Sequence, residues 1–205
     1  MGAIIYPHAM TAQAGEYGAR VGAEVLLGRG EAVALGKPGL SPGSFNASHA
    51  GKKYVLCSLN GALCSFACSQ APLCLLGAFV NAQVTIEYLR SLLKDPGLRG
   101  ITLIACGETW HDAREDESKL RPCLEDLLCA GQILSGVGGE PDCEATVAIA
   151  AYQGCAVRRN ELIRASLSGR ELIQRGYAED VAAALTDDSR PCVVKLERDH
   201  FVPAR

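Results

Sequence analysis

The sequence has 205 residues, of which 48% are hydrophobic and 21% charged, values that exclude intrinsic disorder for the whole chain and allow a buried core. A net charge of −3 argues against a nucleic-acid partner, which a basic face would bind. The longest nearly apolar stretch, residues 71–80, is about half a membrane span, and no signal peptide pattern opens the chain. We therefore expect a cytoplasmic protein that binds neither nucleic acid nor membranes.

The first part of the chain alternates strand-like and helical patterns. Apolar runs predict strands at residues 4–6, 24–27, 54–58 and 73–80, and helical patterns cover residues 11–20, 62–68 and those that follow Asn81. Residues 28–46 hold five glycines and two prolines, and this composition predicts a loop that is too long to be a mere connection.

The second part continues the alternation and then becomes helical. A buried strand is predicted at Ile101–Ala105 and a last strand at Cys192–Leu196, with a helix opened by Pro122 between them and a helical subregion at 142–185. Near-continuous apolar strands separated by helices predict an α/β fold, a layered, mostly parallel or mixed sheet flanked by helices. We expect a single domain over residues 1–205.

The ten cysteines form no Cys-x-x-Cys pair, and no histidine stands near them with the spacing of metal ligands. Most lie in apolar runs such as Tyr54–Cys57, which is typical of buried free thiols in a reducing compartment. A thiol-based redox protein stays an alternative that rests on the number of cysteines alone.

Ligands of open α/β sheets bind where loops leave the carboxyl ends of strands. This rule selects the polar loops at residues 28–46, 58–61, 80–81 and 106–121. A Walker loop, a dinucleotide fingerprint, a serine nucleophile elbow and a His-Glu-x-x-His motif are all absent from the sequence.

The dipeptide Asn60-Gly61 fits two structures equally well. It is a strong hairpin-turn signal after the strand that ends at Ser58. The small residues that follow favour a helix instead, whose N-terminal backbone N–H groups would face an anion. Both alternatives stay open on the sequence alone.

Glu125 and Asp126 stand in the first turn of the helix opened by Pro122. Acidic residues there complement the helix dipole, which explains them without any further role. The functional alternative is a Mg²⁺ site, because hard oxygen ligands beside a substrate phosphate are what this ion prefers. Arg121, directly before them, is either a solvated surface residue or a planar grip for a phosphate or sulfonate.

Three further candidates follow predicted strands. Asn81 is either the N-cap of the next helix or a substrate-binding residue. Gly107 is a substrate-binding candidate in the loop after Ile101–Ala105, and Glu108 is either a metal ligand or an ordinary loop charge.

Several motifs in chain order resemble the 2-phosphosulfolactate phosphatase family. They are Leu40-Ser41-Pro42, Ser58-Leu59-Asn60-Gly61, Gly77–Ala82, Ala105–Trp110, Arg121–Gly131, Ser168–Leu172, Gly176-Tyr177 and Asp180-Val181, and those of residues 105–131 are similar to the bacterial branch of the family. The resemblance runs in order over nearly all of the chain, although each motif alone is weakly specific.

The resemblance implies an α/β phosphatase that depends on Mg²⁺ and hydrolyses the phosphate ester of 2-phospho-3-sulfolactate, a step toward coenzyme M. It makes Glu125 and Asp126 the acidic pair at the catalytic and metal site, and it makes Asn60, Gly61, Asn81 and Arg121 the residues that bind the small anionic substrate. Glu108 as a further metal ligand and Gly107 as a further substrate-binding residue are expected from their place after a predicted strand.

The departure from the family lies at the front of the chain. Family members carry an earlier strand with a Val-Ile-Asp-Val-Leu pattern, and nothing here matches it before the run Ala3–Tyr6. We therefore expect an N-terminally short chain of low activity. A non-catalytic anion-binding relative is the alternative, and an exposed sheet edge would favour a homo-oligomer.

Overall fold

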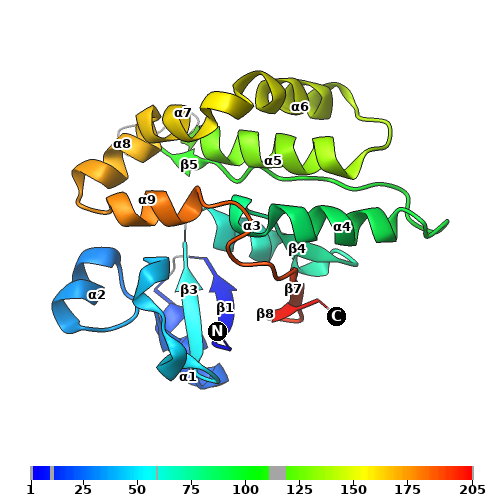
Figure 1. Ribbon diagram of the computed structural model, residues 1–205. Coiled ribbons are helices and arrows are strands. Elements are labelled where there is room, and N and C mark those ends of the chain that lie inside the picture. Colours follow the sequence, from blue (N-terminus) through cyan, green and yellow to red (C-terminus); the bar gives the residue numbers. More distant parts are fainter. Residues whose placement is uncertain (1, 10–11, 59, 111–118, 205) are drawn as a thin grey trace. The chain divides into compact units, whose positions relative to one another are not determined.

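The computed structural model describes residues 2–9, 12–58, 60–110 and 119–204 (Figure 1). The chain divides into two compact units. Unit 1 holds residues 1–75 and 194–204, and unit 2 holds residues 76–193 and Arg205. The single domain expected over residues 1–205 stays a prediction, and each unit is described by itself below.

Unit 1 is built on a mixed sheet of six strands. One edge strand of this sheet includes a single residue of unit 2, Leu76. The strands are β1 (Ile4–His8), β2 (Glu24–Val25), β3 (Lys53–Cys57), β4 (Cys74–Leu76), β7 (Val194–Glu197) and β8 (His200–Pro203), in the order β2-β3-β1-β8-β7-β4. β3 runs parallel to both β1 and β2, whereas β8 runs antiparallel to β1 and β7. The α/β class and the mixed sheet expected from the sequence are confirmed.

The helices of unit 1 correct one prediction and decide another. They are α1 (Ala14–Val21), α2 (Arg29–Leu35) and α3 (Gly61–Ala67), with short 3-10 turns at Pro42–Ser44, Ala47–His49 and Cys68–Gln70. The prediction of a continuous loop over residues 28–46 is wrong, because α2 forms there between Gly28 and the left-handed Gly36. At Asn60-Gly61 the helix is correct and the hairpin is not.

The centre of unit 1 is the middle strand β3 and its aromatic neighbours. Val55 is completely buried, and Tyr54 and Tyr6 are also buried. The rings of Phe45 and His49 pack against that of Tyr54 with centroids 5.5 and 6.0 Å away. This cluster fixes the long connection between α2 and β3 against the sheet.

Unit 2 is mainly helical. Its elements are the 3-10 turns η4 (Phe79–Asn81) and η5 (Ala156–Arg158), the helices α4 (Ala82–Leu92), α5 (Leu124–Val137), α6 (Cys143–Cys155), α7 (Arg159–Ala165), α8 (Leu167–Gln174) and α9 (Ala178–Ala184), and the two-stranded ribbon of β5 (Glu108–Thr109) and β6 (Leu120–Arg121). The range 142–185 therefore contains α6 to α9. α5 and α6 form a closely packed hairpin (Figure 1), in which a Cβ at Gly131 would overlap the carbonyl oxygen of Ala148.

Two predicted strands differ from the structure. Only Cys74–Leu76 of the run 73–80 is a strand, and Ile101–Ala105 lies outside any strand of the described chain. Thr102 and Ile104 are exposed. An apolar run forms a buried strand only where a neighbouring strand pairs with its backbone. The described residues provide no such neighbour for Ile101–Ala105.

No helix in the described part of the chain has both the length and the hydrophobicity that a membrane crossing needs.

Candidate active site

The β5–β6 ribbon and the start of α5 bring five of the eight predicted site residues into one region of unit 2. The backbone of Glu108 lies opposite that of Arg121 in the antiparallel ribbon. Gly107, one residue earlier, has a φ of +72°, and a Cβ at this position would lie 2.9 Å from the carbonyl oxygen of Arg121. Glycine is required here, because a side chain would be strained and would strike the ribbon.

Asp126 ties this turn to the first turn of α5. Its Oδ2 accepts the backbone N–H of Gly107 at 2.6 Å. Burial raises the pKa of the Asp126 carboxyl above its usual range, the hydrogen bond from Gly107 opposes this rise, and the carboxylates of Glu125 and Glu108 add to it. The ionised carboxylate thus lies in a place that is both desolvated and surrounded by negative charge.

Glu125 supplies an oxygen with an unmet hydrogen-bonding need. Its Oε2 is buried and has no hydrogen-bond partner among the residues that the structure describes. Glu108 directs its Oε1 to the backbone N–H of Thr109 at 2.8 Å. A buried carboxylate oxygen without a partner is costly, and a cation or an ordered water would satisfy it.

This donor set fits Mg²⁺, although it does not enclose an ion. Among residues 2–9, 12–58, 60–110 and 119–204, no group of three or more His, Cys, Asp or Glu side chains has the arrangement of a metal site. Mg²⁺ keeps several waters and is usually held by one or two carboxylates together with substrate phosphates, so an acidic pair such as Glu125 and Asp126 is sufficient.

Arg121 is the basic member of the region, and it is 5% exposed, so the prediction of a solvated surface residue is wrong. Its Nη2 donates to Oε2 of Glu171 at 3.2 Å, and its guanidinium lies 5.3 Å from the ring centroid of Trp110. Arginine has five N–H donors, and within the described chain Glu171 is the acceptor for one of them. A buried guanidinium with donors to spare suits a planar anion.

Asn81 stands at the N-cap position of α4 but does not cap that helix with its side chain. Its Oδ1 accepts the N–H of Ala78 at 2.8 Å, and its Nδ2 donates to the carbonyl oxygens of Leu76 at 3.0 Å and Cys192 at 3.1 Å. The carboxamide thereby joins the start of η4 to the segment before β7. Binding of substrate by Asn81 stays a prediction.

Asn60 and Gly61 lie in unit 1, at the start of α3. The N–H of Asn60 is donated to Oγ of Ser58 at 3.2 Å, and its carbonyl oxygen accepts the N–H of Cys64 at 2.9 Å. Their role in anion binding stays a prediction.

The cysteines are all free thiols in the structure. Burial raises the pKa of Cys123 to about 11 and that of Cys129 to about 12. Burial also raises the pKa of Cys57 and Cys74. A reactive cysteine needs a lowered pKa, so these four thiols do not support the redox alternative.

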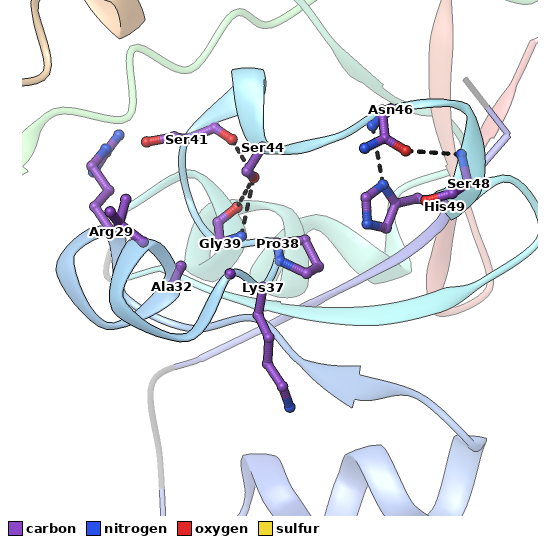
Figure 2. A pocket seen from close by; sticks show the side chains of 12 residues that line it. Arg29, Ala32, Lys37, Pro38, Gly39, Ser41, Ser44, Asn46, Ser48 and His49 are labelled. Carbon is purple, nitrogen blue, oxygen red and sulfur yellow. Dashed lines mark hydrogen bonds between the residues drawn. The ribbon is translucent and has the colours of Figure 1, made fainter.

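The loop predicted at residues 28–46 contributes to a pocket whose lining residues the sequence did not predict. The pocket has a volume of about 410 Å³ and lies in unit 1, with Arg29 on α2 and His49 in the turn before β3 among its lining residues (Figure 2). The length of the predicted loop was the one sequence signal for this pocket. A single arginine and a single histidine form no recognisable motif, so the sequence did not select them.

The fold and the acidic, arginine-containing region together define an α/β protein with charged side chains gathered at the start of α5 in unit 2. The family model described as 2-phosphosulpholactate phosphatase matches residues 3–199, and the chain therefore belongs to the 2-phosphosulfolactate phosphatase family. A protein of Gloeobacter violaceus named probable 2-phosphosulfolactate phosphatase is 26% identical over 132 residues, which are 64% of this chain and 50% of that relative. The chain thus matches half the length of this relative.

Proposed function

We propose that this protein is a Mg²⁺-dependent phosphatase that hydrolyses the phosphate ester of 2-phospho-3-sulfolactate, or of a similar small anionic organic acid, to sulfolactate and phosphate. Membership of the family and the name of the Gloeobacter relative support the reaction class. The observation that carries the proposal is the hydrogen bond of 2.6 Å from Gly107 to Asp126, beside the unpartnered Oε2 of Glu125.

Asp126 and Glu125 are the proposed metal ligands. A ligand role for Glu108 stays a prediction, because the described residues hold no group of three such side chains arranged for a metal ion. When bound, Mg²⁺ would neutralise charge on the phosphoryl group and offset the negative charge of the carboxylates around Asp126. The Gly107 N–H holds the Asp126 carboxylate in place, so its orientation is set before any ligand arrives. Because neighbouring carboxylates and burial raise the pKa of Asp126, a cation at this place would return that pKa toward its ordinary value.

Arg121 is the proposed grip for the anionic substrate. Its guanidinium is held by Glu171 on one side and by the ring of Trp110 on another, which leaves its planar fork preorganised. A fixed guanidinium that faces a phosphate or sulfonate contributes most when the site is shielded from water, as the burial of Arg121 indicates.

The direct experiment measures phosphate release from 2-phospho-3-sulfolactate and from simple phosphate esters, with Mg²⁺ and with a chelator. We expect release that requires Mg²⁺ and falls by about 100-fold or more in Asp126→Asn, because that variant loses a charged ligand but keeps an oxygen for Gly107. Asp95→Asn, which replaces an exposed carboxylate just after α4, is the matched control and should retain full activity.

Folded wild-type protein that releases no phosphate from any of these esters would overturn the proposal and favour the non-catalytic anion-binding alternative. The cytoplasmic location, the homo-oligomer and the absence of a nucleic-acid partner stay predictions.

A further inference from the structure

Helix α6 of unit 2 is poor in charged residues for a helix at the surface. Its thirteen residues, Cys143–Cys155, include one charged side chain, that of Glu144. An ordinary surface helix turns charged side chains to water, as α4 does with Glu87 and Arg90. A helix that is apolar on all sides is typically covered on all sides, so we expect a further surface to pack against the outer face of α6.

The outer face of α6 is a row of small and apolar residues with the spacing of a helix–helix seam. Successive members stand four, three, four and three positions apart, which keeps them on one side of the helix. Val147 is 65% exposed and Val157, in η5, is fully exposed, whereas Ala148 on the inner side is buried. The row, called the α6 seam below, consists of the exposed residues Cys143, Val147, Ala150, Gly154 and Val157.

The sizes of the side chains make the α6 seam complementary to a second copy of itself. A Cβ at Gly154 would meet no atom within 4 Å, so this position is an open hollow in the seam. In an antiparallel pair whose two-fold axis passes beside Ala150, Val147 of each chain lies opposite Gly154 of the other. A large residue opposite a small one is the arrangement that lets two helices approach closely, and a two-fold axis makes the contact twice.

Charges at the two ends of the α6 seam favour the same antiparallel arrangement. Glu144 and Arg158 stand fourteen positions apart, about four helical turns, and so lie on one flank of the seam. The two-fold arrangement places Glu144 beside the partner's Arg158, whereas a parallel pair would place like charges together. Nε and Nη2 of Arg158 donate to Glu161 at 2.9 and 2.6 Å, which leaves Nη1 for this contact.

We propose that this protein forms a homodimer through the α6 seam, with the α6 helices of two copies packed antiparallel about a two-fold axis. The apolar row supplies the attraction, because pairing removes it from water. The end charges select the direction of pairing, and each exposed ion pair adds little to the affinity. The proposal concerns assembly and stands apart from the proposed phosphatase activity.

Sedimentation velocity of the full chain over a range of concentrations tests the dimer. The wild type should reach twice the mass of one chain in a reversible, concentration-dependent manner. Val147→Lys places a charge opposite the partner's Gly154 and should weaken the dimer by about tenfold or more. Val33→Lys, at a valine of α2 that is 75% exposed, is the matched control and should leave the dimer unchanged. Both valines are exposed, so both variants should keep the circular dichroism spectrum of the wild type.

Charge reversal tests the antiparallel direction. Glu144→Arg and Arg158→Glu each turn both end contacts into like-charge contacts, and each should weaken the dimer by about tenfold. An equimolar mixture of these two variants should dimerise as the wild type does, because each end contact then joins an arginine to a glutamate. A mixture of Glu144→Arg with the wild type is the control and should recover less.

A wild-type chain that stays monomeric at its highest soluble concentration overturns the proposal. Equal weakening by Val147→Lys and Val33→Lys, or no weakening by either, also overturns it, since the dimer would then use another surface. A mixture of the two charge variants that dimerises no better than each variant alone contradicts the antiparallel geometry. Phosphate release plays no part in these measurements, so a failed phosphatase assay leaves their outcome unaffected.

Discussion

Two arginines of unit 2 are equally buried but use their guanidinium groups in different ways. All three nitrogens of Arg159 donate: Nη1 and Nη2 reach the carboxylate of Asp187 at 2.7 and 2.9 Å, and Nε reaches Oδ1 of Asn160 at 2.9 Å. Its guanidinium also lies 4.4 Å from the ring centroid of Phe79. Arg121, by contrast, makes one hydrogen bond of 3.2 Å with a described residue, Glu171.

The difference separates the structural role of Arg159 from the substrate-binding role that we propose for Arg121. Arg159 joins the start of α7 to the segment after α9 and has no donor left to offer. Arg121 is buried at comparable cost, yet the described chain uses little of its hydrogen-bonding capacity. Burial of a cation costs free energy because the charge loses its hydration. For Arg121 we infer that an anionic ligand offsets this cost.

Arg159→Met should produce the largest effect. We expect the free energy of unfolding to fall by about 3 kcal/mol, because the bidentate pair with Asp187 and the contact with Phe79 are lost together. Urea titration measures this loss. The neighbouring Arg158 is 65% exposed and pairs with Glu161, so Arg158→Met should cost less than about 0.5 kcal/mol. Equal losses in the two variants would remove the structural role assigned to Arg159.

Arg121→Gln should separate activity from stability. We expect Mg²⁺-dependent phosphate release to fall by about 100-fold, with a change of less than about 1 kcal/mol in the free energy of unfolding. Arg175→Gln, at an exposed position after α8, is the matched control and should change neither quantity. A variant that unfolds as readily as Arg159→Met while the folded fraction keeps full activity would show that Arg121 is structural as well.

Gly107→Ala tests the turn that presents its N–H to Asp126. An alanine at φ +72° with its Cβ 2.9 Å from the carbonyl oxygen of Arg121 should cost about 1–2 kcal/mol of stability. Gly22 has a φ of +67° in the left-handed region with open space around it, so Gly22→Ala has a positive φ without the close contact. Thermal unfolding of both variants isolates the contact, and a smaller loss at Gly107 than at Gly22 would contradict the geometry.

Asp126→Asn should show the smallest effect on stability, visible in its dependence on pH. The pKa of Asp126 is raised in the folded state, so the folded protein binds more protons than the unfolded chain, and stability falls as the pH rises from 3.8 through the folded-state value. Asparagine does not titrate, so the variant should lose less stability than the wild type between pH 4 and pH 7, with a chelator present. Urea titrations at both pH values measure this, and identical losses would show that the pKa is not raised.

Much of the fold follows from local patterns in the sequence. The parallel strands β1 and β3 and the helix α5 fall where short apolar runs and an i, i+3, i+4, i+7 stripe predict them. α2 escaped prediction because glycines begin and end it and the helix has only seven residues. The strand expected at Ile101–Ala105 failed for a different reason, since whether an apolar run forms a strand depends on a partner that the local sequence does not contain.

Local signals in the sequence selected candidate site residues but not the contacts between them. Acidic residues at the start of α5 and a glycine after an apolar run pointed to Asp126 and Gly107, and only the structure shows their hydrogen bond. The buried Arg121 is paired with Glu171, which is fifty positions away in the sequence. No local sequence pattern predicts such a pairing. The same holds for Asn81, whose side chain reaches Cys192.

The most direct test of the central claim locates a divalent ion in the folded protein. Mn²⁺, added at substoichiometric amounts to the ¹⁵N-labelled chain as a paramagnetic substitute for Mg²⁺, should broaden the amide signals of Gly107, Glu108 and Asp126 first. An excess of Mg²⁺ should restore them, and Asp126→Asn should abolish the effect. Broadening that begins elsewhere, or that persists unchanged in Asp126→Asn, would contradict the assignment of the metal site to this loop.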